Sequence, residues 1–396
     1  MTPAVVGALL GAVVAAAPVE PRVAVRFLDR SAPAEVLVEG RGRALQLAAQ
    51  GDALLRDGAP SAQPLALPSA RWRVRIAGEP DREYVGVVEA RAEGGAVRLA
   101  LLLPLERYVA GVVASELPPG TPPEAMRAQA VVARSFALAA RGRHAGDRLC
   151  DLAHCQVLRG HGIDAEHRVA AATAAHATAG QVLRLRSGRV AEAVYHGSCG
   201  GHTADPVEVF GGGGEATGAA AVPDPGCAGP GWSARIPLDV LLGVARERFA
   251  AADTEGPPER AWRSRLDHVS RPSAETVESP SDLTLVRGAG GWVVQVRSRD
   301  GARTSGDGFA RALDRALGWG QVRSARFHLA ADPGGVRLGG SGLGHGVGLC
   351  QAGAARRALG GESYPSILRH YFPQATLGRV SAITISRPMG PPLPRP

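Results

Sequence analysis

Apolar residues recur with two different spacings along the chain, and the change between them predicts two kinds of structure. Between residues 22 and 96, short runs of β-forming residues are separated by Gly, Pro and Asp, the pattern of short strands joined by turns. The predicted strands are Arg22–Phe27, Ala34–Val38, Trp72–Ile76 and Tyr84–Val88. This region is therefore expected to be β-rich and to pack against the rest of the protein.

A helical spacing follows at once. In the run LPLERYVAGVVASELPPG, apolar residues stand at Leu105, Val109, Val112 and Val113, which predicts a helix. Pro118 and Pro119 end it, because a residue before proline is disfavoured in the helical conformation. The next segment, residues 121–142, predicts a second helix. It opens with a capping box from Thr121 to Glu124 with proline at the first helical position, and Gly142 is its expected C-cap.

The remaining chain alternates strand and helix signals. Residues 144–165 predict a loop rich in His, Asp and Cys, and a helix follows from residue 168. The glycine run at 211–214 predicts a flexible turn, since it lacks the lysine of a phosphate loop. Further strands are expected at Gln181–Leu185, Arg189–His196, Leu283–Val286 and Trp292–Val296, and helices near Phe309–Leu317 and at Gly353–Ala358 or Tyr364–Phe372. The fold class is therefore α+β, with the helical hairpin packed on curved sheets.

These patterns divide the chain into four regions. The expected divisions are an apolar segment at 1–17, a β-rich N-terminal region at 18–96, a main domain at 97–385 with a polar excursion at 252–282, and a Pro-rich disordered tail at 386–396. The apolar run Met1–Ala17 ends in small residues, as a secretory signal does, and it is short for a membrane span. We expect export to the periplasm, the cell wall or the medium, with an uncleaved N-terminal anchor as the alternative.

Charge narrows the classes of partner. The formal net charge is +8, and all 45 basic residues are arginine. The arginines are scattered and lack interleaved aromatic residues, which argues against nucleic-acid binding. A positive net charge favours an anionic wall or membrane surface.

Glu116 is the first candidate for chemistry. On a helical wheel it falls on the apolar face of Leu105, Val109 and Val112. Burial raises the pKa of a carboxyl group, and a helix C-terminus disfavours an anion in the same direction. A carboxyl group that stays protonated near neutral pH can act as a general acid. The alternative is a terminal Glu whose side chain simply reaches solvent.

Four segments stand out in order along the chain. The first is LPLERYVAGVVASELPPGTPPEAMRAQAVVARSFAL, which contains Glu116-Leu117-Pro118. The others are CDLAHCQVLRG at 150–160, AVYHGSCGGHTADPVEVFG at 193–211 and GHGVGLCQAGAARRALGGESYPSILRHYF at 344–372. Together they resemble the SpoIID/LytB-like family, that of stage II sporulation protein D, which has Glu-Met-Pro where this chain has Glu116-Leu117-Pro118. The resemblance covers roughly residues 97–380.

The resemblance implies a peptidoglycan lytic transglycosylase acting on glycan strands stripped of stem peptides, with Glu116 as its catalytic acid. It would cleave between MurNAc and GlcNAc and leave a 1,6-anhydro product. A glycoside hydrolase ordinarily needs two carboxylates, whereas a lyase that uses the sugar's own 6-hydroxyl as nucleophile can work with one. No cofactor is required for this chemistry. If a second carboxylate assists, Asp151 and Glu208 are the candidates.

The same motifs suggest substrate-binding residues. Gln129 and Arg134 match polar positions on the second helix; the alternatives are a surface Gln and an Arg paired with a nearby acid. His345 and Gln351 belong to a glycine-flanked loop that lets a ligand approach the backbone. His196 and Ser198 belong to the YHGSCGG segment. His196 is either a hydrogen-bonding residue of the cleft or a core histidine.

Five cysteines, an odd number, leave at least one thiol unpaired or commit several to a metal. The simplest interpretation is two disulfides with Cys350 free, as a small buried residue. Some family members carry zinc in the loop after the second helix, and His144, Cys150 and Cys155 are the matching set. A Cys150–Cys155 disulfide is the alternative to a structural zinc there. Cys199 is expected either to pair with Cys227 or to line the cleft.

Two other functions remain open from the sequence. The first is a wall-binding modifier without catalytic activity that stimulates a separate amidase, as some LytB-like relatives do. The second is a zinc hydrolase built on the 144–155 cluster, although no helical His-x-x-x-His pair supports it. Peptidoglycan glycan strands are the expected partner of both the transglycosylase and the wall-binding modifier. The modifier would also have an amidase as a partner.

Overall fold

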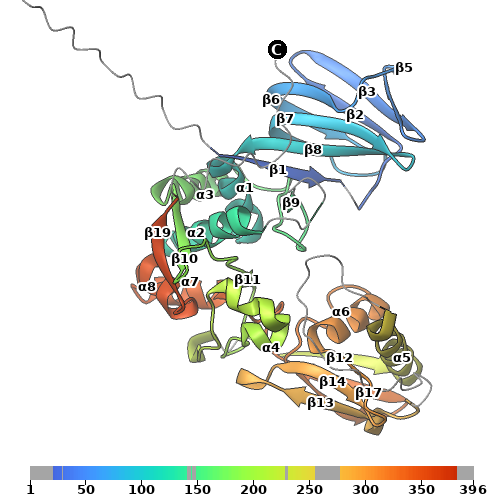
Figure 1. The fold of residues 1–396 in the computed structure, drawn as a ribbon, viewed down its shortest axis with the longest axis vertical. Helices are drawn as coiled ribbons and strands as arrows, with labels where there is room; N and C mark the ends of the chain where they lie inside the picture. Colours follow the sequence, from blue (N-terminus) through green and yellow to red (C-terminus); the bar gives the residue numbers. More distant parts are fainter. Residues whose placement is uncertain are drawn as a thin grey trace, which may run out of the picture.

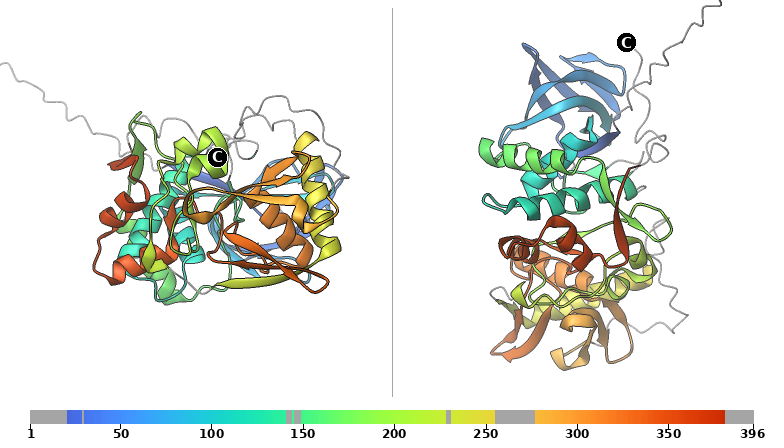
Figure 2. Two further views of the ribbon diagram at one scale, coloured as in Figure 1. Left: turned by 90° about the horizontal axis from the view of Figure 1, so that it is seen from below. Right: turned by 90° about the vertical axis from the view of Figure 1, so that its left-hand side faces the viewer.

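The structure is a computed structural model that describes residues 21–28, 30–140, 144, 149–227, 231–254 and 277–380. A β-sheet forms one end of the molecule, helices occupy its middle, and smaller sheets with their helices form the other end (Figures 1 and 2). This arrangement confirms the α+β class. The apolar segment at 1–17, the cap at Gly142, most of the excursion at 252–282 and the tail at 386–396 lie outside the described residues.

The N-terminal sheet has nine strands in the order β5-β4-β3-β2-β6-β7-β8-β1-β9. All neighbours are antiparallel except β1 and β9, which run parallel. The sheet does not stop at residue 96, because β8 and the short β9 continue it. The strands are β1 (Arg22–Phe27), β2 (Glu35–Gly40), β3 (Arg43–Gln50), β4 (Ala53–Arg56), β5 (Ala59–Pro60), β6 (Leu65–Arg75), β7 (Arg82–Glu93), β8 (Ala96–Pro104) and β9 (Leu149–Cys150).

The predicted helical hairpin is present as α1 (Leu105–Glu116) and α2 (Pro123–Ala139). Leu117, before Pro118, is extended and ends α1 as expected. The predicted capping box is wrong: Pro122 is the N-cap of α2 and makes no side-chain cap. Thr121 instead donates a hydrogen bond to the carbonyl of Pro118, 2.7 Å away, which stabilises the turn between the helices.

The other half of the molecule has its own apolar core. Two three-stranded sheets run in the orders β12-β17-β16 and β13-β14-β15, and two-stranded pairs join β10 to β19 and β11 to β18. The remaining elements of the chain are α3 (Ala165–Ala177), β10 (Gln181–Leu185), β11 (Tyr195–His196), α4 (Pro206–Phe210), η1 (Gly211–Thr217), η2 (Pro225–Cys227), β12 (Trp232–Pro237), α5 (Leu238–Thr254), η4 (Pro280–Asp282), β13 (Leu283–Arg287), η5 (Ala289–Gly291), β14 (Val293–Ser298), β15 (Arg303–Ser305), α6 (Gly306–Leu317), β16 (Phe327–Asp332), β17 (Gly335–Gly340), β18 (Leu349–Cys350), α7 (Gln351–Leu359), α8 (Tyr364–Tyr371) and β19 (Ala375–Arg379).

Two local expectations differ from this structure. The strand predicted at Arg189–His196 shrinks to the two residues of β11, which pair with β18. Val190 makes only an isolated bridge to Arg184 of β10. The glycine run at 211–214 is the start of the 3₁₀ helix η1 rather than a flexible turn. Within the described residues, no helix has the length and hydrophobicity that a membrane span needs.

Helix α2 is the central helix, in contact with α1, α3, α7, α8 and β10. Its Arg134 is fully buried and pairs through two nitrogens with the carboxylate of Glu106 on α1. The same guanidinium donates to the carbonyls of Ala175 on α3 and Gln181 on β10, each 3.1 Å away. Arg134 therefore pairs with a nearby acid, as in the alternative to substrate binding. Its assignment to substrate binding is corrected.

Replacing Arg134 by Met should lower the free energy of unfolding by about 3–5 kcal/mol, the usual cost of breaking a buried ion pair. The variant leaves the carboxylate of Glu106 and two carbonyls without their cation. Denaturant unfolding followed by circular dichroism measures the change. Arg127→Met is the control, because the pair of Arg127 with Glu124 is partly exposed and should contribute less than about 1 kcal/mol. Equal losses from the two variants would contradict the role given to Arg134.

Candidate functional site

Glu116 is the last residue of α1, where its half-buried side chain meets two other segments of the chain. Its Oε1 atom accepts a hydrogen bond from the backbone N–H of Val157 at 2.7 Å. The same oxygen accepts the hydroxyl of Tyr195, on β11, at 2.8 Å. Leu105, Val109, Val112 and Val113, on the same helical face, are all buried. The apolar face predicted from the helical spacing is therefore confirmed, with Glu116 at its end.

The loop at 150–160 is fastened to α1 on both sides of Val157. Tyr108 of α1 donates its hydroxyl to Oε1 of Gln156 at 2.9 Å. The N–H of Arg159 donates to Oγ of Ser115 at 2.9 Å. Gly111 allows this approach, because a Cβ atom there would lie 2.6 Å from the Leu158 side chain. The loop thus holds the N–H of Val157 against the carboxyl group of Glu116.

Burial raises the pKa of Glu116 above its ordinary value. The hydrogen bonds from Val157 and Tyr195 and the nearby charge of Arg159 oppose this shift without cancelling it. Burial and the neighbouring carboxylate also raise the pKa of Tyr195 well above its ordinary value, so its hydroxyl remains a donor. The carboxyl group of Glu116 therefore stays protonated to a higher pH than that of an exposed glutamate.

Neither candidate for a second carboxylate is a hydrogen-bond partner of Glu116 among the described residues. Asp151 accepts the N–H of Leu28 at 3.4 Å and lies 3.8 Å from a nitrogen of Arg82. Burial raises the pKa of Asp151 to about 6. Glu208, on α4, accepts the N–H of Ala289 at 2.9 Å. Both side chains therefore bond to neighbouring backbone N–H groups.

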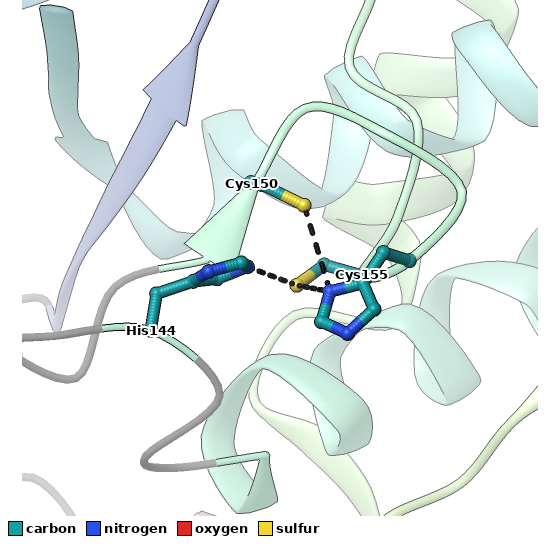
Figure 3. A group of neighbouring side chains, drawn as sticks. His144, Cys150 and Cys155 are labelled. Atoms are coloured by element: carbon teal, nitrogen blue, oxygen red, sulfur yellow. Dashed lines mark hydrogen bonds between the residues drawn. The ribbon is translucent and has the colours of Figure 1, made fainter. Parts of the chain in front are cut away.

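Four possible metal ligands lie together beside the loop. Figure 3 shows His144 and Cys155 facing each other, with Cys150 at the end of β9. Sγ of Cys155 lies 3.5 Å from Nε2 of His144 and 3.7 Å from Nδ1 of His154, and Sγ of Cys150 lies 3.9 Å from the latter atom. All four ligand atoms lie within 4.8 Å of one another. A tetrahedral zinc ion with two sulfur and two nitrogen ligands fits these spacings, and His154 would be its fourth ligand.

Among the described residues, none of the residues predicted to bind substrate is a hydrogen-bond partner of Glu116. Gln129 is fully buried in α2, and neither polar atom of its side chain has a hydrogen-bond partner among the described residues. Gln351 is the first residue of α7, and its buried Nε2 atom also has no hydrogen-bond partner among the described residues. Ser198 places its hydroxyl 3.4 Å from the sulfur of Cys227. None of these contacts includes Glu116.

His196 and His345 do lie close together, with ring centres 5.8 Å apart. Nδ1 of buried His196 bonds to the carbonyl of Val347 at 3.0 Å, and its ring lies edge-on to Trp292. Burial lowers the pKa of His196 to about 3, so the ring is neutral. His196 has the surroundings of a core histidine, while His345 is partly exposed beside it.

Two features of the site were not predicted from the sequence. Tyr195 is the neighbour of the predicted His196, but successive strand residues point to opposite faces, and its hydroxyl reaches Glu116. The second is a buried group of Cys199, Asp224, Cys227 and Cys350. The two expected disulfides are absent, and the sulfur atoms of Cys227 and Cys350 lie 3.2 Å apart. The aromatic residue before His196 was a usable signal for Tyr195, but nothing local indicates which cysteines meet.

Comparison with known proteins finds similarity over the segment that contains Glu116. Residues 93–185 match the SpoIID family model, described as stage II sporulation protein. Stage II sporulation protein D of Bacillus amyloliquefaciens is 29% identical over 285 residues, covering 68% of this chain and 73% of the relative. The matched family segment contains α1, α2 and the loop that contacts Glu116.

Two further relatives are similar over different lengths. An uncharacterized protein of Brachyspira hyodysenteriae is 25% identical over 270 residues, 68% of this chain and 65% of the relative, so the chain spans slightly less than two thirds of that protein. The amidase enhancer of Bacillus subtilis is 52% identical over 40 residues, only 10% of this chain and 6% of that protein. The segment at 93–185, which contains Glu116, is therefore similar to the SpoIID family.

Proposed function

We propose that the protein is a lytic transglycosylase that cleaves peptidoglycan glycan strands, with Glu116 as its acid and base. The single observation that carries the proposal is the position of Glu116: one carboxyl group, raised in pKa by burial and held through Oε1 by Val157 and Tyr195. An acid of this kind is suited to proton transfer at neutral pH. Because both hydrogen bonds fall on Oε1, the transferable proton is expected on Oε2.

In the proposed reaction Glu116 donates its proton to the glycosidic oxygen as the bond from that oxygen to the sugar carbon breaks. The 6-hydroxyl of the same sugar attacks the carbon and closes a 1,6-anhydro ring. The carboxylate of Glu116 then accepts the hydroxyl proton, which restores the acid. One carboxyl group serves both steps, so the lack of a hydrogen bond from Asp151 or Glu208 to Glu116 does not count against the reaction.

The alternative is a modifier that stimulates an amidase. The 40-residue match to the amidase enhancer supports it. A buried acid raised in pKa is costly to maintain, and a protein that only binds has no use for it, so we favour the enzyme. The proposal includes export of the protein, motivated by the apolar segment Met1–Ala17. It also includes a preference for glycan strands without stem peptides, motivated by the family resemblance.

Glu116→Gln should reduce the release of anhydro-ended products from amidase-treated sacculi by ~100 to 10,000-fold. The amide keeps the shape of the side chain but has no proton to transfer. Mass spectrometry of the soluble products measures the loss. Stability at pH 7 should be equal to or above that of the wild type, because the substitution removes a carboxylate that burial disfavours. Wild-type rates in this variant would refute the assignment. Wild-type protein that releases nothing but accelerates an amidase would favour the modifier.

Tyr195→Phe should move the alkaline limb of the kcat/KM profile to higher pH. The Tyr195 hydroxyl stabilises the charged carboxylate of Glu116 and so lowers its pKa; removing this bond raises that pKa further. The reaction needs the protonated acid, so the rate falls as pH rises through the pKa, and the fall comes later in the variant. A pH–rate series on both proteins tests the direction. An alkaline limb that moves to lower pH contradicts it.

A structural zinc at His144, Cys150, His154 and Cys155 is the second part of the proposal. The spacings of these ligands fit the ion, and hydrogen bonding with Cys155 lowers the pKa of Cys150 to about 4, which favours the thiolate that zinc binds. The ion would stabilise the loop that holds the N–H of Val157 against Glu116.

Replacing Cys150 and Cys155 by Ser should remove one zinc per chain and lower the melting temperature. Elemental analysis of protein purified without added metal measures the ion, and scanning calorimetry measures the stability. His161→Ala, in the same loop but outside the cluster, is the control and should keep the zinc. A Cys150–Cys155 peptide two protons lighter than expected, from wild-type protein without zinc, would establish the disulfide instead.

A further inference from the structure

A second group of metal-binding side chains lies in the other half of the molecule. Cys199 follows β11, Asp224 and Cys227 belong to the turn that contains η2, and Cys350 ends β18. All four are buried, with at most 3% of each residue exposed. Their ligand atoms lie within 4.8 Å of one another. Three segments far apart in sequence therefore bring three thiols and one carboxyl group to a single point.

The spacing of the group suits a metal ion. The sulfur atoms of Cys227 and Cys350 are 3.2 Å apart, and Sγ of Cys199 lies 3.5 Å from Oδ2 of Asp224. Zinc–sulfur bonds of about 2.3 Å in a tetrahedron place two sulfur atoms about 3.8 Å apart, so a small outward movement accommodates the ion. A disulfide would join only two of the three thiols and leave the third buried beside a carboxyl group.

The surroundings supply hydrogen-bond donors to these ligands. Cys350 is the N-cap of the nine-residue helix α7, and its sulfur accepts the N–H groups of Gly353 at 3.3 Å and Cys199 at 3.2 Å. The helix N-terminus favours a negative charge at this sulfur. Tyr371 donates its hydroxyl to Oδ2 of Asp224 at 2.6 Å. Such contacts orient ligands around structural metal ions, whereas cysteines that only fill a core need no donors.

Positive charge is also close. A guanidinium nitrogen of Arg357 lies 3.7 Å from Oδ1 of Asp224. Gly353 leaves the carboxyl group its space, because a Cβ atom there would lie 2.0 Å from Oδ2 of Asp224 and 2.1 Å from the Tyr371 hydroxyl. The helix start, the arginine and the tyrosine together offset the charge of an anionic ligand set.

We propose that Cys199, Cys227 and Cys350, with Asp224 as fourth ligand, bind a zinc ion. Thiolates favour zinc among the common divalent ions, and a closed set of four protein ligands is typical of a structural site. Each thiol that coordinates the ion releases its proton to solvent. The ion would fasten the start of α7 and the turn at 224–227 to the segment after β11. The inference does not depend on the proposed lyase activity.

The test is the zinc content of the full chain, purified without added metal. The wild type should carry one zinc that a Cys199→Ser/Cys227→Ser variant loses and a Cys150→Ser/Cys155→Ser variant keeps. The second variant is the matched control, because it changes two cysteines of the other cluster. Asp224→Asn should release zinc to a chelator faster than the wild type. Equal zinc content in the wild type and the Cys199→Ser/Cys227→Ser variant would overturn the proposal.

A measurement on the wild type keeps the proposal testable if that variant does not fold. The protein is denatured with a chelator and alkylated without reductant, and the peptides are weighed. We expect Cys199, Cys227 and Cys350 all to react, because zinc protects thiols without oxidising them. A Cys227–Cys350 peptide that reacts only after reduction, from protein that lacks this zinc, would overturn the site.

Discussion

The ion pair between the fully buried Arg134 and the partly buried Glu106 is the constraint on which the arrangement of the central helices depends. A guanidinium without solvent must use its donors within the protein, and Arg134 uses them on α1, α3 and β10 at once. Glu106 also accepts the N–H of Gly180 at 3.1 Å, before β10. Four elements are therefore oriented about one cation, and the end of α1 is fixed where Glu116 stands.

Given that scaffold, the site itself is built from few contacts. Backbone N–H groups of the loop meet Ser115 and Glu116 at the last turn of α1, and the hydroxyl of Tyr195 arrives from the opposite half of the molecule. Fixed donors of this kind do not reorganise when a proton leaves, which is how an enzyme can stabilise charge at low cost. The structure also contains two clusters of possible metal ligands. One lies in the loop at 144–155, and the other includes Cys350 at the end of β18.

The parts of the fold that depend on neighbouring residues could be predicted from the sequence. Helix α1, its end before Pro118 and the apolar face that includes Glu116 all follow from local spacing. The assignment of Arg134 to substrate failed because helical spacing cannot say what packs against a side chain. A helix apolar on nearly every face, as α2 is, indicates burial, and that signal favoured the ion pair. The contact of Tyr195 with Glu116 depends on the pairing of β11 with β18, and so does the clustering of the three cysteines. This pairing joins segments far apart in the chain.

That two-residue strand pair also affects how the protein is made. Tyr195 pairs with Leu349, and His196 with Cys350, so β11 finds its partner only after most of the chain has left the ribosome. Glu116 and the loop around Val157 are synthesised much earlier. A nascent or truncated chain that ends before Leu349 thus contains the acid but lacks the strand that positions the Tyr195 hydroxyl. Completion of the site is in this way tied to completion of the polypeptide.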